Sequence, residues 1–205
     1  MIELTDLIVA GIGLAGVLLG SLIAVSKDAW ASSRQRRRDG SYAAIRLACL
    51  LDEYADKCID VVQDDGTAYG QPAGRTSDGQ EYLQAQVATP GPPDYPDDIA
   101  WRSLDEKLMH RILALPNMAR STDRHIDAAS DYAHPPDFDE VFEARQQGYA
   151  RIGLESLEIA SALRKRFEIE SVGRVSNNPD WNPEACFRET LQKFEARRKS
   201  MEDAA

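Results

Sequence analysis

The strongest hydrophobic pattern in the chain lies close to its N-terminus. Residues 7–25 contain no charged residue, and Ser21 is their only polar side chain. As an α-helix, these nineteen residues would extend for about 28 Å, close to the hydrocarbon thickness of a bilayer. A cleaved signal peptide would begin with basic residues, whereas residues 1–6 include Glu3 and Asp6 and no Lys or Arg. We therefore expect a transmembrane span rather than a signal peptide or a buried core helix.

The charges on either side of this segment predict its orientation. The basic residues that follow it are Lys27, Arg34, Arg36, Arg37 and Arg38, whereas none precedes it. Because basic residues favour the cytoplasmic side, we expect the N-terminus outside and the C-terminal domain in the cytoplasm. This predicts a single-pass protein of the inner or plasma membrane. Its parts are an anchor (1–25), a basic juxtamembrane segment (26–40), a helical domain (41–201) and a tail (202–205).

Small residues recur on one face of the predicted span. Gly13, Gly16, Gly20 and Ala24 follow one another at steps of three, four and four, which is helical spacing. Such a face lets two membrane helices approach closely, and it predicts homo-oligomers formed through the span. The alternative is that glycine is simply frequent in membrane helices.

The remainder of the chain predicts an all-α fold, a cytoplasmic helical bundle of about five helices. Apolar positions at helical spacing place these helices near residues 41–62, 104–115, 117–132, 137–167 and 183–199. The first of them has the apolar stripe Leu47, Leu51, Tyr54, Cys58 and Val61.

Local signals predict where these helices begin and end. A bend is expected near Asp39 and Gly40, and Pro116 is expected to interrupt a helix because proline has no backbone N–H. Ser103 and Glu106 have the spacing of a capping box. Asn182 followed by a proline reads as an N-cap and first helical position.

Residues 63–98 form a long acidic loop that is rich in proline and glycine. They hold seven acidic residues and one basic residue, Arg75. A short hairpin or strand is expected around residues 81–88. A loop of this length is uncommon unless it is functional or mobile, and a mobile insertion without function is an equal alternative.

Composition then limits the partners. The chain is 43% hydrophobic and 28% charged, as in globular proteins, with a net charge of −10. This balance argues against nucleic acid as the main partner, because phosphate binding needs a basic surface. Residues 1–39 hold five basic and four acidic groups, so the excess negative charge lies from Gly40 onward. We expect this acidic domain to stand off an anionic bilayer.

Candidate chemistry is sparse. The sequence has neither a phosphate-binding Gly-Lys-Ser/Thr loop nor a Gly-x-Ser-x-Gly motif, and Cys49, Cys58 and Cys186 are expected to be free thiols. Asp127, Asp131 and His134 follow one another at helical spacing and are weak candidates for metal ligands. The favoured interpretation of these three residues is a solvated acidic helix face. No catalytic residue and no cofactor are predicted.

These patterns favour a membrane-anchored cytoplasmic helical interaction or scaffold protein, with the bilayer and a protein as its partners. The first alternative is a self-associating membrane effector or pore-forming protein that uses the glycine-rich span. The second is a metal-dependent enzyme at the membrane that uses Asp127 and Asp131. Whether the chain is an enzyme stays open, and the absence of a catalytic motif favours the view that it is not one.

Overall fold

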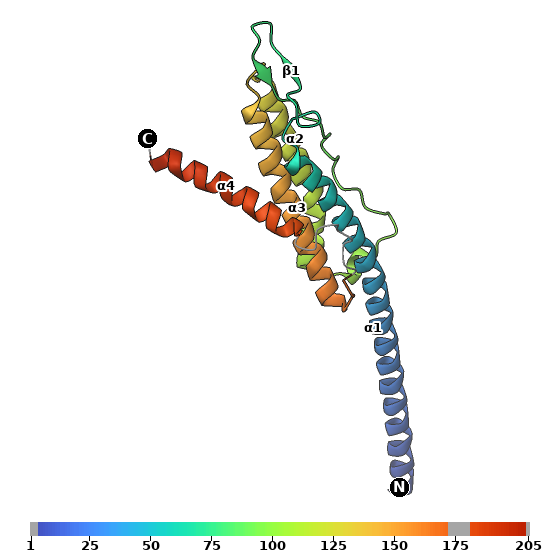
Figure 1. Cartoon of the computed structure of the whole chain (residues 1–205). Helices are drawn as coiled ribbons and strands as arrows, with labels where there is room; N and C mark the ends of the chain where they lie inside the picture. The colour runs from blue at the N-terminus through green and yellow to red at the C-terminus, as the bar shows by residue number, and fades with distance from the viewer. Residues whose placement is uncertain (1–3, 172–180, 204–205) are drawn as a thin grey trace.

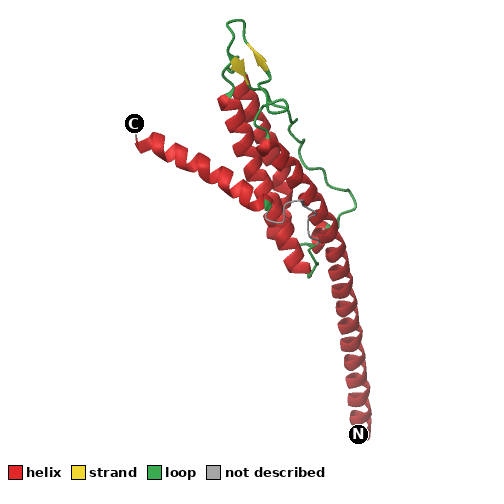
Figure 2. Cartoon of the chain, in the orientation of Figure 1, coloured by secondary structure: helices red, strands yellow, loops and turns green. Residues whose placement is uncertain are grey.

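The computed structural model describes the backbone of residues 4–171 and 181–203, and the side chains of Ser21 and of residues 25–171 and 181–203. Within these residues the protein is all-α, as predicted, with four α-helices and one small hairpin (Figures 1 and 2). The helices are α1 (Leu4–Gln63), α2 (Glu106–Ser130), α3 (Asp139–Phe167) and α4 (Pro183–Asp203). The short elements are β1 (Gly74–Arg75), β2 (Glu81–Tyr82) and the 3-10 helix η1 (Trp101–Ser103).

Helix α1 is one unbroken helix of 60 residues, about 90 Å along its axis. Side chains 25–38 are all exposed, and burial begins at Gly40, where the bundle starts. Helix α1 continues through Asp39 and Gly40 without a break, and its axis changes direction where the bundle begins (Figure 1). A Cβ atom at Gly40 would lie 2.7 Å from Cε1 of Phe167 and 3.0 Å from the carbonyl oxygen of Ser103. Gly40 therefore lets α1 approach its neighbours closely.

Residues 7–25, the predicted membrane span, are α-helical as part of α1. In the part of the chain with described side chains, we find no helix whose length and apolar character would suffice to cross a membrane. Side chains 1–20 and 22–24 lie outside that part, and the predicted span and its glycine face (Gly13, Gly16, Gly20 and Ala24) fall largely or wholly on them.

The core lies between the C-terminal part of α1, α2 and α3, and α3 packs against each of the other three helices. The predicted stripe of α1 is confirmed, because its five residues are all buried: Leu47, Leu51, Tyr54, Cys58 and Val61. Helix α4 crosses α3 and then diverges from the bundle (Figure 1). It is held by the fully buried ring of Phe187, which lies against Gly153 where a Cβ would be only 2.2 Å from Cζ of the ring.

The predicted number of about five bundle helices is wrong, because neighbouring predicted helices are continuous. The helix at 41–62 belongs to α1, and those at 104–115 and 117–132 are both part of α2, with Pro116 inside it. Proline at 116 cannot donate to the carbonyl of Ile112 four residues earlier. The Tyr95 hydroxyl donates to that carbonyl oxygen instead, at 2.7 Å. A tertiary contact thus satisfies the acceptor that Pro116 leaves free.

The cap of α2 also differs from the prediction. Asp105 is the N-cap, and its Oδ1 accepts from the backbone N–H groups of Lys107 and Leu108. Ser103 belongs to η1, where its hydroxyl donates to the carbonyl of Ala100. The N-cap predicted for α4 is confirmed, because Asn182 Oδ1 accepts from the N–H of Glu184 at 2.9 Å.

Candidate functional site

A buried ion pair organises the start of the long loop. Asp64, the first residue after α1, is paired with Arg145 of α3 at 3.1 Å, and the two side chains are only 2% and 7% exposed. Asp64 Oδ2 also accepts from the backbone N–H groups of Gln86 and Val87, at 2.9 and 3.0 Å. Its Oδ1 accepts from the N–H of Gly66. One carboxylate thus holds both the beginning and the return of the hairpin against α3.

Residues 63–98 are therefore held in place along most of their length. After the hairpin, residues 89–96 form an extended segment, which we call the proline strap. It runs over the bundle from the Asp64 contacts toward η1. The Tyr149 hydroxyl of α3 donates to Asp123 Oδ1 at 2.6 Å and lies 3.1 Å from the carbonyl oxygen of Pro90. Tyr95 binds α2 through Ile112, and Asp98 accepts from Arg46 of α1 at 2.6 and 2.7 Å. The loop thus contacts α1, α2 and α3.

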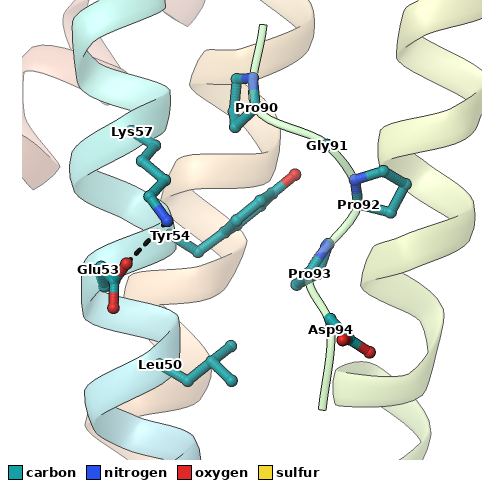
Figure 3. A pocket seen from close by; sticks show the side chains of 9 residues that line it. All are labelled: Leu50, Glu53, Tyr54, Lys57, Pro90, Gly91, Pro92, Pro93 and Asp94. Carbon is teal, nitrogen blue, oxygen red and sulfur yellow. Dashed lines mark hydrogen bonds and ion pairs between the residues drawn. The ribbon is translucent and has the colours of Figure 1, made fainter.

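A groove of about 470 Å³ lies between α1 and the proline strap (Figure 3). Its α1 side presents Leu50 and Tyr54, with Lys57 and Glu53 paired at 2.7 Å on the rim. The Tyr54 ring extends from the helix toward the strap, and its buried hydroxyl has no hydrogen-bond partner. The strap side consists of residues 90–94.

The groups near this groove are poor acids and bases at neutral pH. Burial raises the pKa of the Tyr54 hydroxyl and of the Cys58 thiol well above their ordinary values, so both stay protonated. Burial also raises the pKa of Tyr149, and its hydrogen bond to Asp123 adds to this effect. The Lys57 ammonium lowers the pKa of Glu53, which stays ionised. None of these groups is poised for proton transfer or nucleophilic attack.

The end of the bundle farthest from the N-terminus of α1 presents a different surface, which we call the distal end (Figure 1). It consists of the hairpin, the turn between α2 and α3, and the first turns of α3. A slot of about 160 Å³ lies there, the distal slot. Its surface is mostly apolar. The lining comes from the segment after β2, the end of α2, the turn and the start of α3: Gln84, Ala85, Ser130, Ala133, Phe138, Val141 and Phe142.

Two further hollows adjoin the distal slot. One, of about 370 Å³, shares Ala133 with it and contains Asp137 and Glu140. The other, of about 310 Å³, shares Phe142 with it and contains three carboxylates and two cations: Asp65, Asp139, Glu143, Lys193 and Arg197. Each hollow thus shares one lining residue with the distal slot, and we refer to the three together as the distal depression, with an apolar centre and carboxylates on both sides.

The weak metal-ligand candidates lie beside this depression, but the structure does not gather them into a metal site. Asp127 is exposed on α2, and Asp131 is the C-cap of that helix. His134 lies beyond the helix end, where its Nδ1 is 2.7 Å from the carbonyl oxygen of Ala133. Among the described residues, no three His, Cys, Asp or Glu side chains lie close enough together to hold a metal ion.

The basic juxtamembrane residues all lie on the projecting part of α1. Lys27, Arg34, Arg36, Arg37 and Arg38 are exposed. The Arg34 guanidinium lies 5.0 Å from the ring centroid of Trp30, and Arg37 pairs with Glu168 at 3.4 Å, just beyond α3. Trp30 itself is 65% exposed.

No protein-family model matches this chain, and no curated protein or solved structure resembles it significantly. Its function must therefore be argued from the fold and the surface.

Sequence reasoning missed both the Asp64–Arg145 pair and the distal slot. The pair joins residues 81 positions apart, and the slot joins residues from 84 to 142. The available signals were an aspartate directly after a helix, and two adjacent apolar residues, Val141 and Phe142, among the acidic residues of a helix start. Neither signal shows which segments meet.

We predict that Arg145→Met lowers the free energy of unfolding by about 3–5 kcal/mol, because it leaves the Asp64 carboxylate buried without its partner. Urea denaturation of the full chain in uncharged detergent, followed by circular dichroism, measures this loss. The matched control is Arg75→Met, which removes the exposed pair with Glu81 and should cost less than about 1 kcal/mol. Equal effects of the two substitutions would show that the buried pair does not hold the loop.

Proposed function

We propose that this chain is a membrane-anchored interaction protein, in which an acidic helical bundle on a helical stalk presents its distal end to a protein partner. In this proposal residues 7–25 cross the membrane, with the N-terminus outside and the bundle in the cytoplasm. The bilayer is then one partner and a protein is the other. Neither nucleic acid nor a cofactor is part of the proposal.

The continuity of α1 is the observation that supports this proposal most directly. Side chains 25–38 are exposed and burial on α1 begins at Gly40. For residues 7–25, which hold no charge, a bilayer would supply an apolar environment. Residues 26–39 would then form a stalk of about 21 Å, with the basic residues near anionic headgroups. Because no loop interrupts the helix, the anchor would set the direction in which the bundle points.

The surface favours binding over catalysis. The buried hydroxyls and thiol near the groove stay protonated, and the described residues hold no metal cluster. The distal end, in contrast, exposes large apolar and aromatic side chains: Tyr69 at 106%, Tyr132 at 83% and Leu83 at 37%. Exposed aromatic residues beside an apolar hollow are typical of protein interaction surfaces.

We predict that the protein resists extraction by alkaline carbonate from membranes of the cells that express it. Replacing two residues of the proposed span, Leu14→Asp and Leu18→Asp together, should release it, because each charge at the centre of a span costs about 2.5–3.5 kcal/mol. Ile45→Asp is the control, since it places a charge on an exposed position of the same helix. Extraction of the unaltered protein would contradict the anchoring.

If the bundle presents its distal end to a protein partner, that partner should stay bound when the full chain is purified from membranes in mild detergent. Replacing the hairpin tip, residues 67–83, by a short Gly-Ser linker that keeps Asp64 and Val87 should reduce the captured partner at least several-fold. Glu195→Lys, a change on exposed α4, is the control and should not reduce it. A preparation without any stoichiometric partner would contradict the role.

One observation favours the second candidate, a self-associating membrane protein. Tyr42, Ile45 and Cys49 are exposed on α1, with Tyr42 at 57% and Ile45 at 45%. They follow Gly13, Gly16 and Gly20 by 29 residues each, which is about eight turns of a continuous helix. The small-residue face and these exposed residues therefore share one side of α1, away from the core stripe. Two parallel copies could meet along that side.

This candidate predicts that Cys49 of two copies becomes disulfide-linked when membranes that contain the protein are treated with a mild oxidant. Gly16→Leu with Gly20→Leu should reduce the cross-linked dimer at least several-fold, because the bulkier side chains keep the helices apart. Cys49→Ser is the control, because any cross-link that remains in this variant must involve another cysteine. Cross-linking that is unchanged by the two leucines would count against association through the glycine face.

A further inference from the structure

The distal slot is large enough for one apolar side chain of a ligand. Its volume of about 160 Å³ is close to that of an engineered cavity of ~150 Å³ that binds benzene. Ala85 on its rim is exposed and Phe138, Val141 and Phe142 are half-buried, so the bundle itself does not fill the space. A leucine, methionine or phenylalanine from another molecule would bury its apolar surface there.

The carboxylates around the slot differ from those on the sides of the bundle. On the sides, Glu155 and Glu158 pair with Arg111, and Asp52 pairs with Arg164. In the two hollows beside the slot, Asp137 and Glu140 on one side and Asp65 and Asp139 on the other form no ion pair with any residue of the described part of the chain. In the hollow next to Phe142, Arg197 pairs with Glu143 and Lys193 adds a second positive charge. The excess of negative charge is therefore larger on the side of Asp137 and Glu140.

The helix dipole explains only some of these carboxylates. Asp139 and Glu140 lie in the first turn of α3, where negative charge stabilises the helix. Asp127 and Asp131 lie at the opposite kind of end, the C-terminus of α2, where negative charge is unfavourable and no basic residue compensates it. Helix stability thus does not account for these two carboxylates.

We propose that the distal slot and its acidic flanks bind a basic segment of the partner protein, in which Lys or Arg residues flank one apolar anchor side chain. This inference rests on the proposed recruiting function and names the chemistry of the partner. The anchor enters the slot between Ala85, Ala133 and Phe142. The basic residues lie over the hollow of Asp137 and Glu140, where charge complementarity fixes the direction of the segment. An anionic lipid surface does not fit this end, because the same carboxylates repel it.

The test is fluorescence anisotropy with the full chain in uncharged detergent and a labelled heptapeptide that has one leucine between two Arg-Arg pairs, each separated from it by one serine. We expect saturable binding. Replacing the leucine of the peptide by alanine should weaken it about ten-fold or more, because the anchor is lost. Replacing the arginines by glutamates should abolish it. Equal binding of the leucine and alanine peptides would overturn the proposal.

Variants of the protein locate the binding. Ala85→Phe should weaken binding about ten-fold by filling the slot, whereas Ala88→Phe, at an exposed position of the same segment, should not. Glu140→Lys should weaken it several-fold at low salt and little at high salt, whereas Glu195→Lys, with the same change in net charge, should not. Undiminished binding by both Ala85→Phe and Glu140→Lys would overturn the proposal.

A further peptide distinguishes binding of a different protein in the slot from binding of a second copy of this chain. Residues 26–39 contain Trp30 and four arginines, and a peptide of that sequence is itself basic with one aromatic anchor. If this peptide binds and the synthetic heptapeptide does not, the slot belongs to self-association, and the proposal is overturned. Failure of all peptides would overturn this inference alone, because carbonate extraction and partner capture test the proposed function without them.

Discussion

The buried pair of Asp64 and Arg145 is the interaction on which the other contacts of the long loop depend. Backbone N–H groups from two loop segments complete the hydrogen bonds of the buried carboxylate. Arg145 also donates to the carbonyl oxygen of Val87, whereas its Nε is buried without a hydrogen-bond partner. These contacts of Asp64 place the hairpin over the α2–α3 turn and fix the position at which the proline strap begins. The strap then brings Tyr95 to Ile112, which allows α2 to continue through Pro116. The distal slot exists because these segments meet.

The second constraint is the continuity of α1. No loop separates the part of α1 that precedes Gly40 from the bundle that follows it, so the helix couples the directions of the two parts. For the proposed membrane protein, this means that the distal end points away from the bilayer at a height set by the stalk. An acidic surface at that end stays clear of anionic lipids and free to meet a basic partner.

The fold could be predicted from the sequence further than the site could. Apolar spacing predicted an all-α chain and the buried face of α1, because a helix that packs on one side must repeat its apolar residues every three or four positions. The composition of residues 63–98 also predicted the acidic character of the loop. The slot could not be predicted, since Ala85, Ala133 and Phe142 lie on three segments with separate local patterns. Local signals misplaced a helix end at Pro116, where the distant Tyr95 binds the carbonyl that the proline leaves free.

By itself, the sequence determined which segments are helical, which faces are apolar, and how charge divides between a basic N-terminal part and an acidic remainder. These properties follow from residues that are neighbours along the chain or one helical turn apart. Only the tertiary structure decided that the long loop is held in place, that α2 passes through a proline, and that an apolar slot opens among carboxylates. Each of these depends on contacts between residues far apart in the chain, and such contacts form only when burial brings the segments together.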